Sequence, residues 1–263
     1  MKNVLYYFLN HKKINGTLFY CFEYFACAKQ NDPNIIFNIY NISPNDLEIV
    51  KNIFRERYVV PEGYLDDVKA LNSISELYKT TYTKTLILDL HSFQRTYMFI
   101  KNDILCYSND SHSMERSTTK NVTYYGYYDY QNFDHKTPLK LNFSIFRPIY
   151  NTGKKIFVSS RRYNYKEIEL PIELQHKEVV TKAESTHHAN LFEIFDTMYY
   201  FHSDFDTNNR LIPECFFYDK KIVLQLNAKF KDSIALRYED ILKNGLRNYT
   251  LDHTDKMICD FLE

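Results

Sequence analysis

The apolar and polar positions of the chain alternate between short apolar runs and longer segments with helical spacing. In the segments read as helices, apolar residues recur every three or four positions, as Leu47, Val50 and Phe54 do, with Ser43 or Asn45 as a candidate N-cap. Strand-length apolar runs occupy residues 4–9, 35–42, 85–90 and 104–107, and helical or partly amphipathic segments occupy 18–30, 46–57, 65–78 and 92–101. This alternation predicts a parallel, doubly wound sheet.

Residues 111–150 break the alternation, because they are rich in tyrosine, irregular and polar, and they contain Pro138 and Pro148. We interpret them as the end of a first domain and the linker that follows. The dense tyrosine run at 124–130 is expected to be a strand that packs some of its rings against the core. Aromatic faces also stack on sugars and on unpaired bases, so a ligand-binding role stays open for this run.

A second alternation of strands and helices follows the linker. Its expected strands are 155–159, 179–182, 197–201 and 221–226, and its expected helices are 190–195, 212–218 and most of 232–263. We therefore predict an α/β protein of two Rossmann-like domains, 1–148 and 149–263, with parallel sheets facing a central cleft. The last helix is expected to pack back on the first domain. The competing interpretation is a single sheet of nine or ten strands.

Composition narrows the class of protein. The 263 residues are 44% hydrophobic and 25% charged, which is ordinary for a globular chain and excludes disorder and coiled coil. The 33 basic and 33 acidic residues balance, so no overall positive field favours nucleic-acid binding. No signal peptide or membrane span is evident, and we expect a cytoplasmic protein. Five scattered cysteines are expected to be reduced, buried thiols: Cys21, Cys27, Cys106, Cys215 and Cys259.

Common cofactor motifs are absent from the sequence. The chain has no glycine-rich dinucleotide fingerprint, no phosphate-binding loop with its lysine, no paired-histidine zinc motif and no nucleophile elbow. We therefore do not expect a dinucleotide or ATP site of the usual kind.

The most informative segment runs from residue 195 to 223. It is expected to form a strand, a polar loop, a helix with Pro213 and Glu214 in its first turn, a tight turn at 217–220 and a further strand. In a parallel sheet, the loop after a strand and the helix start that follows it face the ligand crevice, and free N–H groups at a helix start attract phosphate. The Glu214 carboxylate either accepts hydrogen bonds from two vicinal hydroxyl groups or balances the helix dipole.

This segment resembles the donor-binding end of glycosyltransferases of the two-Rossmann-domain (GT-B) type. Those enzymes carry a helix with a proline and an acidic residue, then a turn with glycine where this chain has Asp219. The resemblance implies that Glu214 binds the ribose of a nucleotide sugar. It also implies that a basic residue after the first strand of the second domain neutralises the donor diphosphate. The expected donor-binding residues are Gly16, Arg161, Arg162, Asn208, Asn209, Arg210 and Glu214.

The donor-binding candidates besides Glu214 have their own residue-level arguments. Arg161 and Arg162 directly follow the expected strand 155–159, and a guanidinium group binds phosphate oxygens in pairs. Both could equally be solvated surface arginines. Gly16 lies in a loop that would face the crevice, where a residue without a side chain lets a ligand approach the backbone closely.

Two residues after the strand at 85–90 are candidates for the acceptor side. A carboxylate at Asp89 or an imidazole at His91 would deprotonate an acceptor hydroxyl. The alternatives are that Asp89 caps the following helix and that His91 packs in the loop.

Two short motifs raise the question of a metal. Asp204 and Asp206, one residue apart after a strand, resemble the metal–diphosphate signature of the other large glycosyltransferase architecture. His187 and His188 have only Glu184 as a nearby candidate ligand. We expect no resident cofactor, with the nucleotide sugar as co-substrate, and the divalent metal as the less favoured alternative.

The leading functional hypothesis is transfer of a sugar, a hexose or pentose, from a nucleotide diphosphate sugar to a hydroxyl group. The acceptor is either a glycan or a hydroxymethylated DNA base, as with phage DNA-glucosylating enzymes of the same fold. A DNA acceptor would need a local basic cleft, for which residues 12, 13, 95, 101 and 116 are candidates. The alternatives are a non-catalytic nucleotide-binding or interaction module, a metal-dependent enzyme that uses the two aspartates, and a nucleotide-sugar isomerase.

Overall fold

The structure is a computed structural model, and its contacts divide the chain into two compact units. Unit 1 comprises residues 1–55, 59–145 and 249–263, and unit 2 comprises residues 56–58 and 146–248. The structure describes residues 2–8, 14–73, 75–76, 82–88, 102–108, 122–129, 134–135, 138–151, 153–159, 168–180, 191–202, 209–226 and 232–263.

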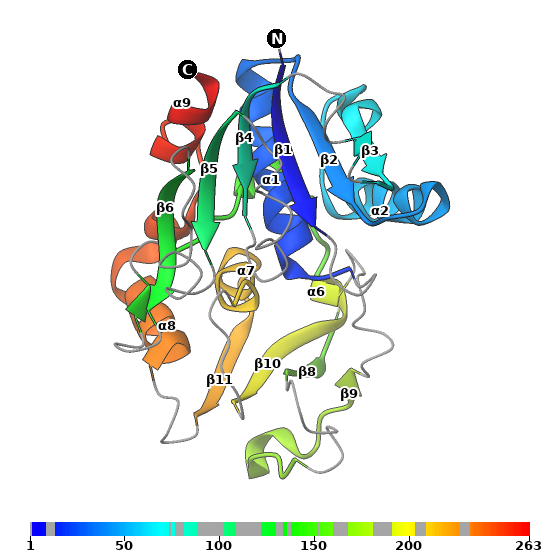
Figure 1. The fold of residues 1–263 in the computed structure, drawn as a ribbon. Coiled ribbons are helices and arrows are strands. Elements are labelled where there is room, and N and C mark those ends of the chain that lie inside the picture. Colours follow the sequence, from blue (N-terminus) through cyan, green and yellow to red (C-terminus); the bar gives the residue numbers. More distant parts are fainter. Residues whose placement is uncertain are drawn as a thin grey trace. The chain divides into compact units, whose positions relative to one another are not determined.

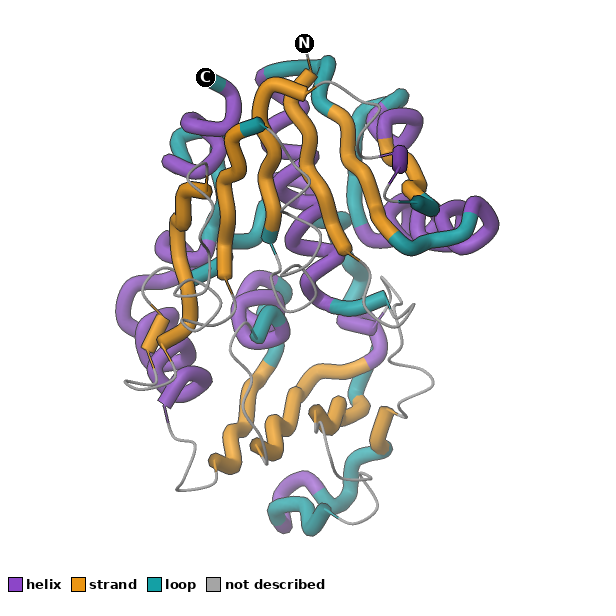
Figure 2. The backbone as a smooth tube through the Cα atoms, viewed as in Figure 1, coloured by secondary structure: helices purple, strands orange, loops and turns teal. Residues whose placement is uncertain are grey.

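Unit 1 is built on one mostly parallel sheet (Figures 1 and 2). Its strands lie in the order β3-β2-β1-β4-β5-β6-β7, and all neighbours are parallel except β6 and β7. The bounds are β1 Lys2–Phe8, β2 Ile36–Tyr40, β3 Val68–Leu71, β4 Tyr82–Ile87, β5 Asp103–Ser108, β6 Val122–Asp129 and β7 Asp134–His135. The chain moves outward from β1 to β3 and then returns to the other side of β1, so the strand order reverses between β1 and β4.

One face of this sheet is covered by α1 (Gly16–Asn31), as Figure 1 shows. The side chain of Asn15 caps the helix by accepting hydrogen bonds from the N–H groups of Thr17 and Leu18 at 3.0 and 3.2 Å. Every residue from 18 to 29 is buried, in agreement with a helix whose sequence is apolar all round. Phe22 and Phe25 pack their rings on Phe37 of β2, which joins the helix to the sheet.

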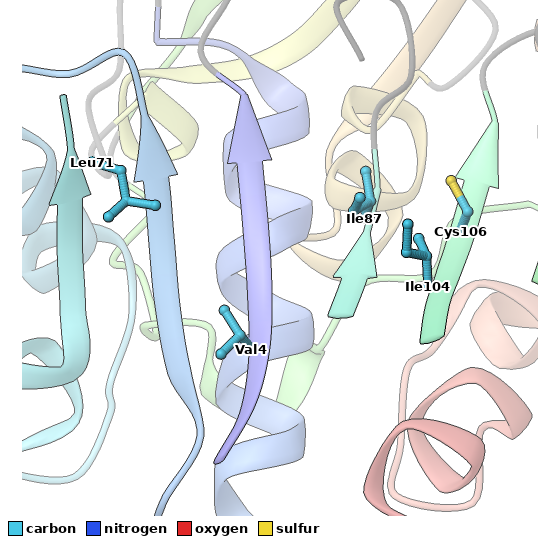
Figure 3. Packing of buried hydrophobic residues seen from close by; sticks show 5 residues of the cluster. All are labelled: Val4, Leu71, Ile87, Ile104 and Cys106. Atoms are coloured by element: carbon cyan, nitrogen blue, oxygen red, sulfur yellow. The ribbon is translucent and has the colours of Figure 1, made fainter. Parts of the chain in front are cut away.

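The opposite face of the same sheet has its own apolar cluster, which Figure 3 shows. In the parallel register, Val4 lies beside Thr85 of β4, and Thr85 lies beside Ile104 of β5. Two residues further along the same strands, Ile87 lies beside Cys106, so these side chains point to the same face of the sheet. The cluster consists of Val4, Leu71, Ile87, Ile104 and Cys106. Burial on both faces explains why these strands read as continuous apolar runs rather than alternating ones.

The remaining elements of unit 1 complete its core. Helix α2 (Pro44–Arg57) buries Leu47, Val50 and Phe54, and the Ser43 hydroxyl accepts from the Asp46 N–H at 3.1 Å, so Ser43 rather than Asn45 is its cap. The C-terminal helix α9 (Lys256–Leu262) packs on α1 and β4 within the same unit. Two short 3-10 helices, η1 (Tyr64–Asp67) and η3 (Phe143–Ile145), lie in the connections.

Two sequence expectations for unit 1 were wrong. The segment 65–78, interpreted as partly amphipathic, contains η1 followed by strand β3. In β3, Val68 and Leu71 are buried and Lys69 is exposed. The segment 111–150, interpreted as irregular, contains β6 and β7, and β6 pairs with β5 as the sixth strand of the sheet. The tyrosine run is thus a strand, as expected. The expected helix at 92–101 lies outside the described residues.

Unit 2 is built on a four-stranded parallel sheet in the order β11-β10-β8-β9. Its strands are β8 Lys155–Ser159, β9 Val179–Val180, β10 Phe195–His202 and β11 Lys221–Leu226. Its α-helices are α6 Leu191–Ile194, α7 Leu211–Phe217 and α8 Asp232–Asn244. Its 3-10 helices are η5 Ile172–Leu174 and η7 Gly245–Tyr249, and η7 ends at the unit boundary. The strand order reverses between β8 and β10. The described strands form two sheets, one in each unit, so the single-sheet alternative was wrong.

Helix α7 ends in a Schellman motif. The Lys220 N–H donates to the Cys215 carbonyl at 2.8 Å, and the Asp219 N–H donates to the Phe216 carbonyl at 3.3 Å. Asp219 has a φ of 53°, in the left-handed region that favours glycine. The turn therefore has a backbone conformation that glycine adopts without strain and that Asp219 adopts here.

The expected burial of the cysteines is found at four of the five positions, and Cys259 is half-buried. Among the described helices, none is long and apolar enough to span a bilayer.

Candidate functional site

In sequence, most of the predicted site residues come directly after strands that flank a reversal of strand order. Asp89 and His91 follow β4, and Gly16 follows β1, the two strands that flank the reversal in unit 1. In the same way, Arg161 and Arg162 follow β8, and residues 208–210 follow β10, the two strands that flank the reversal in unit 2. Ligands of open parallel sheets bind beyond the carboxyl ends of strands at such a reversal.

Within unit 2, the structure brings Glu214 together with two arginines. The Nη2 of Arg57 donates to Oε1 of Glu214, and Nε and Nη2 of Arg210 both lie 2.7 Å from the same oxygen. The side chains of Glu214, Arg210 and Arg57 are 1%, 7% and 12% exposed. A carboxylate this deeply buried is stable only when paired, and two guanidinium groups provide that pairing.

The two carboxylate oxygens of Glu214 differ in their partners. Every hydrogen bond that the described residues give to this side chain goes to Oε1, and Oε2 receives none from them. A carboxylate oxygen has two lone pairs, so Oε2 remains an acceptor for a ligand or a water. The arrangement leaves Glu214 able to accept hydrogen bonds through Oε2 while Oε1 is held.

Arg57 and Tyr58 were missed by the sequence analysis, because they precede Glu214 by more than 150 positions. Tyr58 is 1% exposed, its hydroxyl accepts from Nη2 of Arg210 at 3.4 Å, and the Arg57 guanidinium lies 5.8 Å from its ring centroid. Tyr58 also packs edge-on against Phe146, which packs against Phe217 of α7. Neither residue has a local sequence signal, since only the tertiary fold of unit 2 brings residues 57 and 58 to α7.

The first turn of α7 is held by Asn209. Its Oδ1 accepts from the Ile212 N–H at 3.0 Å, and its Nδ2 donates to the Tyr200 hydroxyl at 3.1 Å. Its backbone carbonyl accepts from Nη1 of Arg237 on α8. The side chain of this predicted donor-binding residue therefore holds the helix start in the structure.

Of the other predicted site residues, only Gly16 lies among the residues that the structure describes. Gly16 is the first residue of α1 and does not have a positive φ, so the backbone there does not require glycine. Asp89, His91, Arg161, Arg162 and Asn208 lie outside the described residues, as do the candidate metal ligands Glu184, His187, His188, Asp204 and Asp206. Among the residues that are described, no group of three or more metal-ligand side chains comes together.

Two ionisable groups near Glu214 are perturbed. Burial raises the pKa of the Cys215 thiol well above its usual value, and the neighbouring Glu214 carboxylate adds to this effect, so Cys215 stays protonated at neutral pH and is unsuited to act as a nucleophile. Burial lowers the pKa of the Lys220 amine, whose Nζ lies 5.5 Å from the Phe195 ring centroid. Within the described part of the chain, that amine has no hydrogen-bond partner.

Comparison with known proteins identifies a fold and no family. No protein-family model matches the sequence, and no curated protein matches it. Among solved structures, the chain resembles HepE from Anabaena, determined in complex with UDP-glucose, with a TM-score of 0.50 and 7% sequence identity. The likeness covers 100% of this chain and 93% of HepE. At this identity the likeness establishes an α/β fold with parallel sheets, which is the α/β part of the fold expected from the sequence.

Proposed function

We propose that this protein is a glycosyltransferase that takes its sugar from a nucleotide diphosphate sugar. The observation that carries the proposal is the likeness, over the whole chain, to a protein solved with UDP-glucose. The buried Glu214 carboxylate agrees with it, because Oε2 remains an acceptor for sugar hydroxyls just after the strand reversal of unit 2. UDP-glucose is accordingly the first donor to test.

Unit 2 is the proposed donor unit. Glu214 would accept hydrogen bonds from the ribose, and the diphosphate would be neutralised by arginines after β8 and β10. Arginine suits this role because its planar fork binds two phosphate oxygens at once. The proposed donor-binding residues are Arg161, Arg162, Asn208, Asn209, Arg210 and Glu214, with Gly16 proposed for close backbone approach.

The proposed reaction exchanges one bond to the anomeric carbon for another. The bond between C1 of the sugar and the phosphate oxygen breaks, the nucleoside diphosphate leaves with the electron pair, and a bond forms between C1 and the acceptor oxygen. The hydroxyl proton passes to a base, for which Asp89 and His91 are the proposed residues. Arginines that neutralise the leaving diphosphate lower the barrier by stabilising charge that develops in the transition state.

The acceptor is proposed to be a hydroxyl group on a glycan or on a hydroxymethylated DNA base. The balanced charge of the chain gives no preference for DNA, so the two acceptors are arms of one experiment.

The experiment measures release of free nucleotide from a panel of UDP-, GDP- and ADP-sugars. Each donor is incubated with glycan acceptors, with hydroxymethylcytosine DNA, and without acceptor. We expect one nucleotide to be released faster when an acceptor is present, and Glu214→Gln to slow that release. Chelation with EDTA tests the alternative that Asp204 and Asp206 hold a metal, because activity would then be lost.

The same experiment separates the remaining alternatives. Nucleotide binding without release in any arm would favour a non-catalytic nucleotide-binding module. A changed sugar on an intact nucleotide would indicate an isomerase. Absence of both binding and release across the panel would contradict the proposed function.

A further inference from the structure

The proposed ribose-binding carboxylate is held asymmetrically. Arg57 and Arg210 approach Oε1 of Glu214 from different elements, the end of α2 and the start of α7. Neither arginine donates to Oε2. The side chain of Glu214 is thus fixed at one oxygen by two charged donors, while the other oxygen receives no hydrogen bond from the described residues and is left as an acceptor.

Two donors constrain Glu214 more than one would. Arg210 lies four positions before Glu214 on the same stretch of chain, so it moves with the helix that carries the carboxylate. Arg57 is held elsewhere, because Tyr58 beside it is buried and the Arg57 carbonyl accepts from the Arg147 N–H at 3.2 Å. Arg57 therefore fixes the carboxylate relative to a second, independently anchored segment of unit 2.

We propose that Arg57 is a positioning residue for nucleotide recognition: it holds Oε1 of Glu214 so that Oε2 faces the ribose hydroxyls of a ribonucleoside diphosphate. The inference rests on the proposed function and deepens it, because it assigns a role to a residue far from α7 in sequence. It also makes the preference for ribose over a sugar without hydroxyls depend on Arg57, which does not itself contact the ligand.

The test compares the affinities of UDP and 2′,3′-dideoxy-UDP, measured by isothermal titration calorimetry on the full chain. Arg57→Gln removes the charged guanidinium group, and Arg57→Lys keeps the positive charge without the planar guanidinium. Arg55→Gln is the matched control, since Arg55 lies two positions earlier on α2 and is exposed. Circular dichroism confirms that each variant is folded.

We expect the wild-type chain and Arg55→Gln to bind UDP about tenfold or more tightly than the dideoxy compound, because hydrogen bonds to a carboxylate are lost. In Arg57→Gln this ratio should fall toward one, through weaker UDP binding and unchanged binding of the dideoxy compound. Arg57→Lys should give an intermediate ratio. If Arg57 had a purely structural role, the Arg57→Gln variant would bind both ligands more weakly by the same factor.

Other outcomes overturn the inference in distinguishable ways. A wild-type ratio retained in Arg57→Gln, or loss of folding in both Arg57 variants, overturns the positioning role alone. A wild-type ratio of one overturns ribose recognition by Glu214 while nucleotide binding stands. Failure of the wild-type chain to bind UDP, GDP or ADP overturns the proposed function itself.

Discussion

Arg57 donates a hydrogen bond to Oε1 of Glu214 across 157 positions of sequence. This contact joins residues 56–58 to the remainder of unit 2, and it lies among the most buried charges of that unit. It serves the fold by pairing a buried carboxylate, and it presents the other carboxylate oxygen as an acceptor. The contribution of this contact to the free energy of unfolding is therefore the first property to measure.

Glu214→Ala should destabilise the protein by about 3–5 kcal/mol, because it leaves two buried guanidinium groups without their carboxylate. Arg57→Ala should cost less, about 1–3 kcal/mol, since Arg210 still pairs with Glu214. Urea unfolding followed by circular dichroism measures both, and the double variant gives the coupling between them.

The matched control for this cycle is Glu178→Ala, which breaks the exposed pair of Lys155 and Glu178 in the same unit. It should cost under about 1 kcal/mol, as exposed ion pairs do. A Glu214→Ala variant as stable as this control would show that the buried cluster does not stabilise unit 2.

Replacement of Asp219 should stabilise the protein. Its positive φ of 53° strains any residue with a Cβ, and its carboxylate lies at the negative end of the α7 dipole. Asp219→Asn removes only the unfavourable charge, whereas Asp219→Gly also removes the strain, so we expect gains of about 0.3 and about 0.5–1 kcal/mol. A thermal unfolding midpoint for Asp219→Gly below that of the wild type would contradict this account of the turn.

A side chain at Gly153 should be poorly tolerated. A Cβ there would overlap the backbone carbonyl of Ile194, which belongs to the helix that leads into β10. Gly153→Ala should therefore cost about 1–3 kcal/mol or more, as overpacking does. Gly63→Ala is the comparison, because a Cβ at Gly63 meets open space and its φ of 85° adds only strain of about 1 kcal/mol. Equal losses in urea unfolding would count against a close backbone approach at Gly153.

Lys220→Met should raise stability at neutral pH by about 1 kcal/mol, because it removes a 6%-exposed ammonium without a hydrogen-bond partner in the described part of the chain. Burial lowers the folded-state pKa of Lys220, so its charged form is the costly one. The cost is fully present below the folded pKa and disappears as the pH rises from there toward the ordinary lysine value of about 10.4.

The gain from Lys220→Met should therefore shrink as the pH is raised from 7 toward 10. Urea unfolding of both proteins across that range measures it, with Lys221→Met, at the exposed neighbouring position, as the control. A gain that does not change with pH would show that charge burial is not its cause.

The sequence predicted most of the fold because buried parallel strands have a distinctive apolar pattern. Segments such as 155–159 and 221–226 became strands with the expected bounds, since they are continuous apolar runs between polar turns. Strand β3 was missed because it has only four residues, one of them an exposed lysine. Strand β6 was expected within the tyrosine run, but its pairing with β5 in the first sheet was not, because the surrounding segment 111–150 is irregular and polar.

The candidate site was predictable only where its residues are close in sequence. Arg210 and Glu214 lie one helical turn apart in a segment that carries the expected donor-site pattern, so both could be proposed from the sequence. Arg57 entered the site through tertiary packing of the α2 end, which no local pattern encodes. At Asp219 the resemblance leads one to expect glycine. The backbone there has the left-handed conformation that glycine favours, although the residue is aspartate.

The most direct test of the proposed donor site is a crystal structure of this protein grown with UDP. We predict UDP in unit 2, with its ribose hydroxyls within hydrogen-bond distance of Oε2 of Glu214 and with Oε1 still held by Arg57 and Arg210. UDP bound elsewhere, or a Glu214 carboxylate with Oε2 turned into the protein and no ribose beside it, would contradict the account.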